Sequence, residues 1–161
     1  MKSYPSVCDA RGLRFAVVVS RFNHPISRRL LEACAEELEQ RGALPEDVHV
    51  AWVPGAFEIP LAAATLAASG RYAAVVTLGA VIRGGTPHFD YVCRAVTDGV
   101  REAARDSGVP VAFGVLTTDD VEQALERAGE GEANKGREAA RAAIEMACLR
   151  RALEKPPGEA S

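Results

Sequence analysis

Aromatic residues are scarce in this chain of 161 residues: they fill 6% of its positions, whereas hydrophobic residues of all kinds fill 48%. Alanine and valine dominate the hydrophobic set, which suits helices packed on a parallel sheet better than an aromatic-rich binding module. An excess of basic residues is also absent, because the formal net charge is −3. We therefore expect no nucleic-acid partner. The length corresponds to one domain, and we assign residues 1–161 to it.

Three kinds of sequence signal are missing. The cysteines Cys8, Cys34, Cys93 and Cys148 never approach C-x-x-C spacing, so we expect free thiols in a reducing cytoplasm and no metal site. The longest apolar run near the N-terminus covers only residues 15–19, so we expect an untargeted cytoplasmic protein without membrane contact. Neither G-x-G-x-x-G nor G-x-x-x-x-G-K-[ST] occurs, which leaves dinucleotide and P-loop sites without motif support.

Hydrophobic runs of strand length alternate with amphipathic runs of helix length, the pattern of a parallel sheet wound with crossover helices. The predicted strands cover residues 13–20, 48–53, 73–82 and 111–117. Four of the predicted helices cover residues 27–41, 57–68, 89–107 and 135–153. A further predicted helix precedes the last of these; it is capped by Asp119 or Asp120 and ends at Gly129. This pattern predicts an α/β fold: a three-layer flavodoxin-like sandwich with a four-stranded parallel sheet in the order 2-1-3-4. Residues 1–12 are expected to form an arm and residues 155–161 a flexible tail.

The turn Gly84-Gly85-Thr86-Pro87-His88 follows a predicted strand and precedes a predicted helix. In this fold class, ligands bind where the carboxyl ends of the strands meet. Glycines let a ligand approach the backbone, and the first amides of a helix attract anions, so phosphate suits this turn. His88 can donate and accept protons near neutral pH. The sequence therefore predicts that chemistry takes place at this turn.

Other residues at the same edge each allow two interpretations. Phe22 could lie over a planar heterocycle or close the core, and the sequence favours neither. Glu58 could cap a helix or contact ligand hydroxyls. Arg127 and Lys135 flank the turn between the last two helices, where basic residues are ordinary partners of a helix terminus. They matter for ligand binding only if they face a phosphate pocket, and that pocket would more naturally belong to a neighbouring subunit.

Five collinear segments resemble the lumazine synthase family, and together they span about residues 13–153. They are S-R-F-N-H, V-P-G-A-F-E-I-P, G-A-V-I-R-G-G-T-P-H-F-D-Y-V, F-G-V-L-T-T-D, and E-Q-A-L-E-R-A-G followed by N-K-G-R-E-A-A. The resemblance implies condensation of 5-amino-6-(D-ribitylamino)uracil with 3,4-dihydroxy-2-butanone 4-phosphate. The products would be 6,7-dimethyl-8-ribityllumazine, phosphate and water, in the penultimate step of riboflavin biosynthesis. No cofactor is implied.

The resemblance also implies roles for particular residues. Phe22 would stack on the pyrimidine, and His88 would transfer protons. The other pyrimidine- and ribityl-binding residues would be Asn23, Ala56, Phe57, Glu58, Ala80, Val81, Ile82, Phe113 and Lys135. The butanone phosphate would be bound by Gly85, Thr86 and Arg127. Phe113, Arg127 and Lys135 are expected to come from an adjacent subunit.

The family assembles as pentamers, and some members pack these into decamers or an icosahedral shell. We therefore expect an obligate homo-oligomer, with the arm adding a strand to a neighbouring subunit and with riboflavin synthase as a candidate partner. Three alternatives remain: a lumazine- or flavin-binding paralogue without catalytic activity, an archaeal-type riboflavin synthase, and a purely structural shell.

Overall fold

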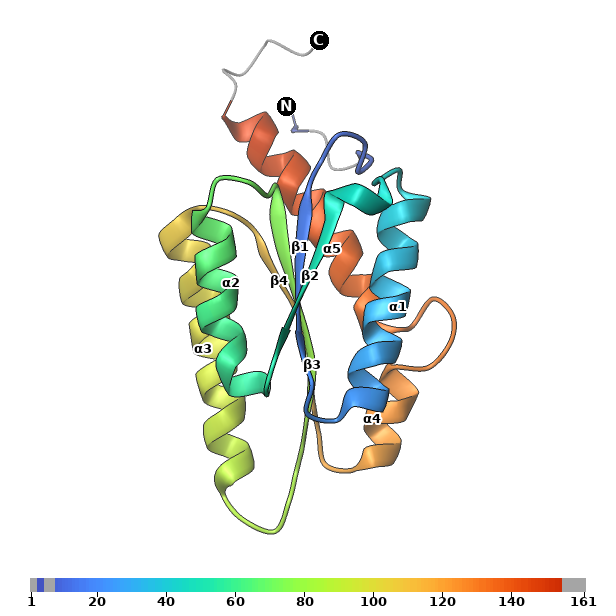
Figure 1. Ribbon diagram of the computed structural model, residues 1–161, viewed down its shortest axis with the longest axis vertical. Helices are drawn as coiled ribbons and strands as arrows, with labels where there is room; N and C mark the ends of the chain where they lie inside the picture. The colour runs from blue at the N-terminus through green and yellow to red at the C-terminus, as the bar shows by residue number, and fades with distance from the viewer. Residues whose placement is uncertain (1–2, 5–7, 155–161) are drawn as a thin grey trace.

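A four-stranded parallel sheet lies between two layers of helices in the computed structural model, which describes residues 3–4 and 8–154 (Figure 1). The strands are β1 (Phe15–Ser20), β2 (Val48–Val53), β3 (Ala74–Ile82) and β4 (Val111–Thr118). The helices are α1 (His24–Gln40), α2 (Ile59–Ala68), α3 (His88–Ser107), α4 (Val121–Arg127) and α5 (Lys135–Leu153). The strand order is β2-β1-β3-β4, which confirms the predicted topology.

The sheet has a hydrophobic core on each face, because helices cover both sides. All six residues of β1 are buried. Phe15, Val17 and Val19 belong to the core beneath α1 and α5, whereas Ala16 and Val18 belong to the core beneath α2 and α3. A strand buried on both faces appears in the sequence as an uninterrupted apolar run. That is why β1 could be located without polar alternation.

The predicted element boundaries differ from the observed ones at a few ends. The first helix begins at His24 rather than residue 27, because a proline is tolerated in the first turn of a helix. The second helix begins at Ile59 rather than residue 57, because Ala56–Glu58 forms a separate 3₁₀ turn. The first strand begins at Phe15 rather than residue 13, and α4 ends at Arg127 rather than residue 129.

The expectation of free thiols is wrong for two of the cysteines. Cys8 and Cys148 form a disulfide, with Cα atoms 6.3 Å apart across a sequence separation of 140 residues. This Cα distance lies within the usual range for a disulfide. The buried Cys34 and the partly buried Cys93 are free thiols. Burial raises the pKa of Cys34 to about 12, so this thiol stays protonated.

The end of the predicted arm packs on its own chain. Ala10 is fully buried, and its N–H donates to the carbonyl of Arg41 at 2.8 Å. Residues 1–2 and 5–7 of the arm and all of the predicted tail, 155–161, lie outside the described residues. A strand donated to a neighbouring subunit stays a prediction.

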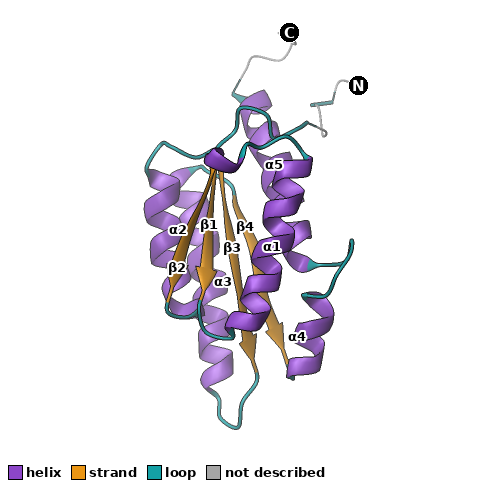
Figure 2. Cartoon of the chain, turned by 45° about the vertical axis from the view of Figure 1, so that its right-hand side comes forward, coloured by secondary structure: helices purple, strands orange, loops and turns teal. Residues whose placement is uncertain are grey.

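Helices α1 and α5 lie side by side on one face of the sheet (Figures 1 and 2), and they touch closely at Gly136. A Cβ added to Gly136 would overlap the main-chain carbonyl oxygen of Leu30 and lie 2.9 Å from its Cα. The same helix pair holds a buried carboxylate, Glu37, which is 2% exposed. Gly136 thus lets the backbones of α1 and α5 approach closely at one point. At another point the two helices are joined by ion pairs of Glu37 with arginines of α5.

Candidate active site

The loops that follow β1 and β2 are joined through their main chains. Arg21 N–H donates to the Val53 carbonyl at 2.8 Å, and Phe22 N–H donates to the Pro54 carbonyl at 3.0 Å. Phe22 is 71% exposed, so it does not close the core of this chain. Of the two interpretations left open by the sequence, closure of the core is therefore wrong for this chain, and stacking of Phe22 on a planar heterocycle stays a prediction.

Asn23 links the β1 loop to the end of β3. It has a left-handed backbone with φ of 59°, a conformation that asparagine adopts more readily than most residues. Its Nδ2 donates to the Ala80 carbonyl at 2.9 Å. Asn23 therefore has a structural role in this chain: it ties the loop that carries Phe22 to the end of β3.

The end of β3 has one uncovered edge. Pairing with β1 stops at Leu78, whereas β3 continues to Ile82 and pairs with β4 throughout. Of the three residues predicted to meet a heterocycle, Ala80 already uses its carbonyl to accept from Asn23, while Val81 and Ile82 are only half-buried. Alternate residues of a parallel strand face the same neighbour, and the Arg83 N–H donates to the Thr118 carbonyl of β4, so the main-chain groups of Val81 face β4 and those of Ile82 face the uncovered edge. Backbone contacts with a ring stay a prediction.

Glu58 caps the short turn after β2. Its Oε2 accepts from the Gly55 N–H at 2.9 Å, which confirms the capping interpretation for this side chain. Beside it, Ala56 is buried and Phe57 is 63% exposed. The capping contact orients the Glu58 carboxylate at the same edge as Phe22.

The turn between β3 and α3 is open to solvent. Gly84, Gly85, Thr86 and His88 are all exposed. Pro87 occupies the N-cap position of this 20-residue helix without a side-chain capping bond, and Asp90 is an acidic residue in its first turn. His88 is the first residue of α3. The turn therefore presents an accessible imidazole at the start of a helix, and anion binding there stays a prediction.

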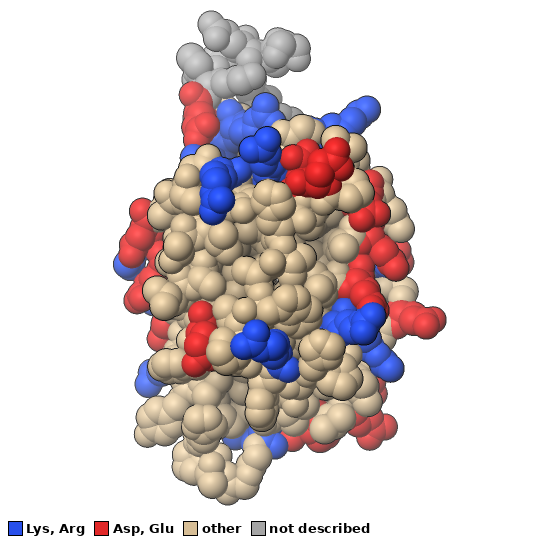
Figure 3. All heavy atoms as spheres, viewed as in Figure 1, with Lys and Arg blue, Asp and Glu red and all other residues tan. Residues whose placement is uncertain are grey.

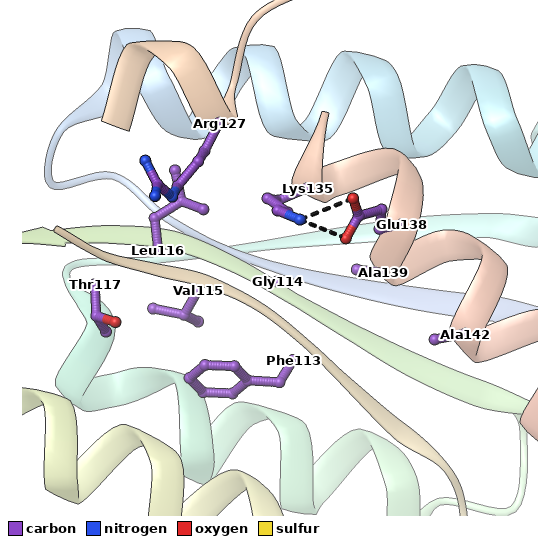
Figure 4. A pocket seen from close by; sticks show the side chains of 10 residues that line it. All are labelled: Phe113, Gly114, Val115, Leu116, Thr117, Arg127, Lys135, Glu138, Ala139 and Ala142. Atoms are coloured by element: carbon purple, nitrogen blue, oxygen red, sulfur yellow. Dashed lines mark hydrogen bonds and ion pairs between the residues drawn. The ribbon is translucent and has the colours of Figure 1, made fainter. Parts of the chain in front are cut away.

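A pocket with a volume of about 370 Å³ lies beside β4 (Figure 4). Its lining is contributed by β4, α4 and α5 and consists of Phe113, Gly114, Val115, Leu116, Thr117, Arg127, Lys135, Glu138, Ala139 and Ala142. Three residues predicted from the resemblance thus meet in one place: Phe113, Arg127 and Lys135. Phe22, Glu58 and His88 are not among the described residues that line this pocket.

The two cations of this pocket have different local partners. Nη1 of Arg127 donates to the Gln123 carbonyl at 3.0 Å, as expected of a basic residue at a helix C-terminus. Nζ of Lys135 contacts both oxygens of Glu138, at 2.8 and 2.7 Å (Figure 4). Lys135 stands at the first residue of α5, where the helix dipole disfavours a cation, so Glu138 offsets that cost. Sequence reasoning missed Glu138, although its i,i+3 spacing from Lys135 could have indicated the pair.

Two negative findings concern other site types. In the described part of the chain, no three residues among His, Cys, Asp and Glu are grouped closely enough to hold a metal ion. Over the same residues, no helix is both long enough and apolar enough to cross a bilayer.

The fold defines a doubly wound α/β protein, in which ligands bind at the carboxyl ends of the parallel strands, and Phe22, Glu58 and His88 lie in segments that follow such ends. The family model described as 6,7-dimethyl-8-ribityllumazine synthase matches residues 12–151, and the chain belongs to this family. The matched range contains every site residue predicted from the sequence. The resemblance seen in the sequence is thereby confirmed at the level of the family.

Proposed function

We propose that the chain condenses 5-amino-6-(D-ribitylamino)uracil with 3,4-dihydroxy-2-butanone 4-phosphate. The products are 6,7-dimethyl-8-ribityllumazine, phosphate and water, in the penultimate step of riboflavin biosynthesis. Membership of the lumazine synthase family supports this reaction class. The structural observation that carries the proposal is the exposed turn before α3, in which an exposed imidazole stands at a helix start without a side-chain cap. Such a turn can bind a phosphorylated ketone and serve the proton transfers that follow.

The pyrimidine is proposed to bind against Phe22. The exposed ring offers a flat apolar face, and the uncovered edge of β3 at Ile82 offers main-chain groups to a polar heterocycle. Phe57 and Glu58 stand at the same edge, with the Glu58 carboxylate directed by its bond to Gly55. These groups suit a substrate that combines a planar ring with a hydroxylated chain.

The phosphate of the ketone is proposed to bind at Gly85 and Thr86. The main-chain amides there and the positive end of α3 attract an anion, and a guanidinium from Arg127 adds a charged donor. His88 then stands beside the bound ketone. It is proposed to move protons during imine formation, phosphate elimination and ring closure, while orientation of the two substrates supplies much of the acceleration.

A complete site is proposed to need two copies of the chain. Phe113, Arg127 and Lys135 gather in the pocket beside β4, separate from the edge that carries His88, so a neighbouring subunit could bring them to it. A largely uncharged area lies on the face shown in Figure 3. Exposed apolar side chains of the chain include Val50, Trp52, Phe57 and Leu61. We propose a pentamer or a pentamer-based assembly in the cytoplasm, with riboflavin synthase as a candidate partner.

The proposed reaction is tested by mixing the purified protein with both substrates and following lumazine absorbance and phosphate release against the uncatalysed background. Saturable acceleration of both signals supports the proposal. Tight lumazine binding without acceleration would instead indicate a binding paralogue. Conversion of lumazine supplied alone would indicate an archaeal-type riboflavin synthase.

Replacing His88 by alanine is expected to slow turnover without abolishing it. A positioned acid–base group typically contributes about 10²- to 10⁴-fold, while substrate orientation survives the substitution. The measurement is kcat at saturating concentrations of both substrates. His49→Ala is the matched control, because His49 lies on β2 and contacts the Tyr72 hydroxyl at 2.9 Å. An unchanged kcat for His88→Ala would remove His88 from the mechanism.

Replacing Arg127 by alanine is expected to raise the KM for the phosphorylated ketone by about 10- to 100-fold, the value of a charge-assisted hydrogen bond. The KM for the pyrimidine should change much less. Arg105→Ala is the control, because Arg105 is an exposed arginine on α3 that pairs with Asp106 at 2.9 Å. A rise confined to the pyrimidine KM would show that the phosphate assignment is wrong.

A further inference from the structure

The turn that presents His88 is held at its two ends. Among the described residues, Arg83 forms hydrogen bonds at the start of this turn, and Asp90 forms hydrogen bonds just after it. Between them, a Cβ added to Gly84 or Gly85 would meet no atom within 4 Å. Two glycines without packing partners give the turn many conformations to sample. Something else must therefore restrict where the first residue of α3 lies.

Arg83 contacts three different segments. Its main-chain N–H donates to the Thr118 carbonyl at 2.9 Å, which extends the β3–β4 pairing by one step. Its Nε donates to Oδ1 of Asp119 at 2.9 Å, and its Nη1 donates to Oδ1 of Asp90 at 3.3 Å. The guanidinium carbon also lies 4.2 Å from the centre of the Phe89 ring.

These contacts join the residue before the turn to the residues after it. Phe89 and Asp90 directly follow His88 in the first turn of α3, and Phe89 is anchored by burial. Arg83 therefore connects the last residues of β3 to the helix turn that carries the imidazole, and it ties both to the loop after β4. A planar guanidinium can cover a ring and bond two carboxylates at once, whereas the single ammonium of lysine cannot reproduce that arrangement.

We propose that Arg83 is a positioning residue for His88, holding the start of α3 in register with β3 across the Gly84-Gly85-Thr86-Pro87 turn. The inference rests on the proposed function in that His88 transfers protons. Arg83 and both its carboxylate partners are substantially exposed, so their ion pairs contribute little to global stability. Their effect is on catalytic geometry, where a displacement of about 1 Å can cost about 10²-fold in rate.

The first test is Arg83→Gln, which removes the charge and keeps most of the length. We expect kcat to fall about 10- to 100-fold, with the urea midpoint of unfolding close to that of the wild type. Arg83→Lys should recover part of the rate, and Asp119→Asn should cause a smaller loss in the same direction. Arg101→Gln is the matched control, since Arg101 pairs with Asp98 at 3.5 Å on the exposed side of α3. A rise in the KM for the ketone with unchanged kcat would overturn the proposal, because Arg83 would then be a binding residue.

The second test repeats Arg83→Gln in a His88→Ala background. If Arg83 acts through His88, the second substitution should lower kcat by less than about threefold there. Equal fold-losses with and without His88 would overturn the proposal, because the two residues would then act independently.

A third measurement does not depend on the reaction. Amide hydrogen exchange over residues 84–90 should be faster in Arg83→Gln than in the wild type, and unchanged in Arg101→Gln. Equal exchange in all three proteins would overturn the positioning role. If the wild type formed no lumazine, the proposed function would fail, whereas exchange would still decide whether Arg83 holds the turn.

Discussion

Gly136→Ala is expected to destabilise the chain by at least about 3 kcal/mol, the upper end of the usual cost of overpacking a core. Overpacking a core usually costs about 1–3 kcal/mol when side chains can shift. Here the added Cβ would overlap a main-chain carbonyl, that of Leu30 in α1, which cannot rotate away. The whole helix α5 would have to move, although it also packs on β3 and β4.

The measurement for Gly136→Ala is urea unfolding followed by circular dichroism. Gly84→Ala is the control, because its Cβ would meet nothing within 4 Å and its φ is not positive. Alanine in a helix is favoured over glycine by about 1 kcal/mol when space allows. A Gly136→Ala protein as stable as the wild type would therefore show that α1 and α5 do not approach as closely as described.

Glu37→Ala is expected to be the next most damaging change, at about 3–5 kcal/mol. The Glu37 carboxylate accepts from Nε of Arg41 at 2.9 Å, from Nη1 of Arg137 at 3.1 Å and from Nε of Arg141 at 2.8 Å. Arg41 and Arg141 are partly exposed, so solvent screens their ion pairs with Glu37 and lowers what these pairs contribute to stability. Arg137 is only 8% exposed, and its Nε has no partner among the described residues. Without Glu37, that buried guanidinium would keep only its pair with Glu36.

The same residue predicts acid sensitivity. Hydrogen bonds from Arg141 above all, and then from Arg137 and Arg41, lower the pKa of Glu37 to about 2. Because the folded-state pKa lies below the unfolded value, this group stabilises the fold fully above about pH 4.5, and the contribution is lost as pH falls towards 2. The difference in urea unfolding between the wild type and Glu37→Gln should therefore be largest at pH 6 and should shrink steadily as pH falls towards 2.

Glu32→Gln is the control for Glu37, since Glu32 forms an exposed ion pair with Arg28 at 2.8 Å on the same helix. It should change stability by less than about 1 kcal/mol. A constant difference between wild type and Glu37→Gln across this pH range would contradict the assigned pKa shift.

The parts predicted best from the sequence are those decided by local physics. The strand at Val48–Val53 and the helix at Lys135–Leu153 have the predicted bounds. Asn134 caps that helix by accepting from the Gly136 N–H, a contact between close neighbours in sequence. The Gly84-Gly85-Thr86-Pro87-His88 turn was likewise placed between a strand and a helix by its own residues, because glycine and proline act on the backbone where they stand.

The parts that sequence reasoning missed depend on contacts between distant residues. Glu37 meets Arg137 from 100 positions away, and Arg83 meets Asp119 from 36 positions away, so no spacing rule connects them. The Cys8–Cys148 pairing was excluded on spacing alone, although the fold brings the two Cα atoms within disulfide range.

Taken by itself, the sequence determined the α/β class, the parallel sheet and the turn that bears His88, because hydrophobic period, helix caps and turn residues act locally. Only the tertiary structure decided that the Asn23 side chain donates a hydrogen bond to the Ala80 carbonyl. It likewise decided that Arg127 shares a pocket with Phe113 rather than with His88. It also decided how closely α1 approaches α5. Those outcomes depend on how the helices pack across the sheet, and packing is a property of the whole chain.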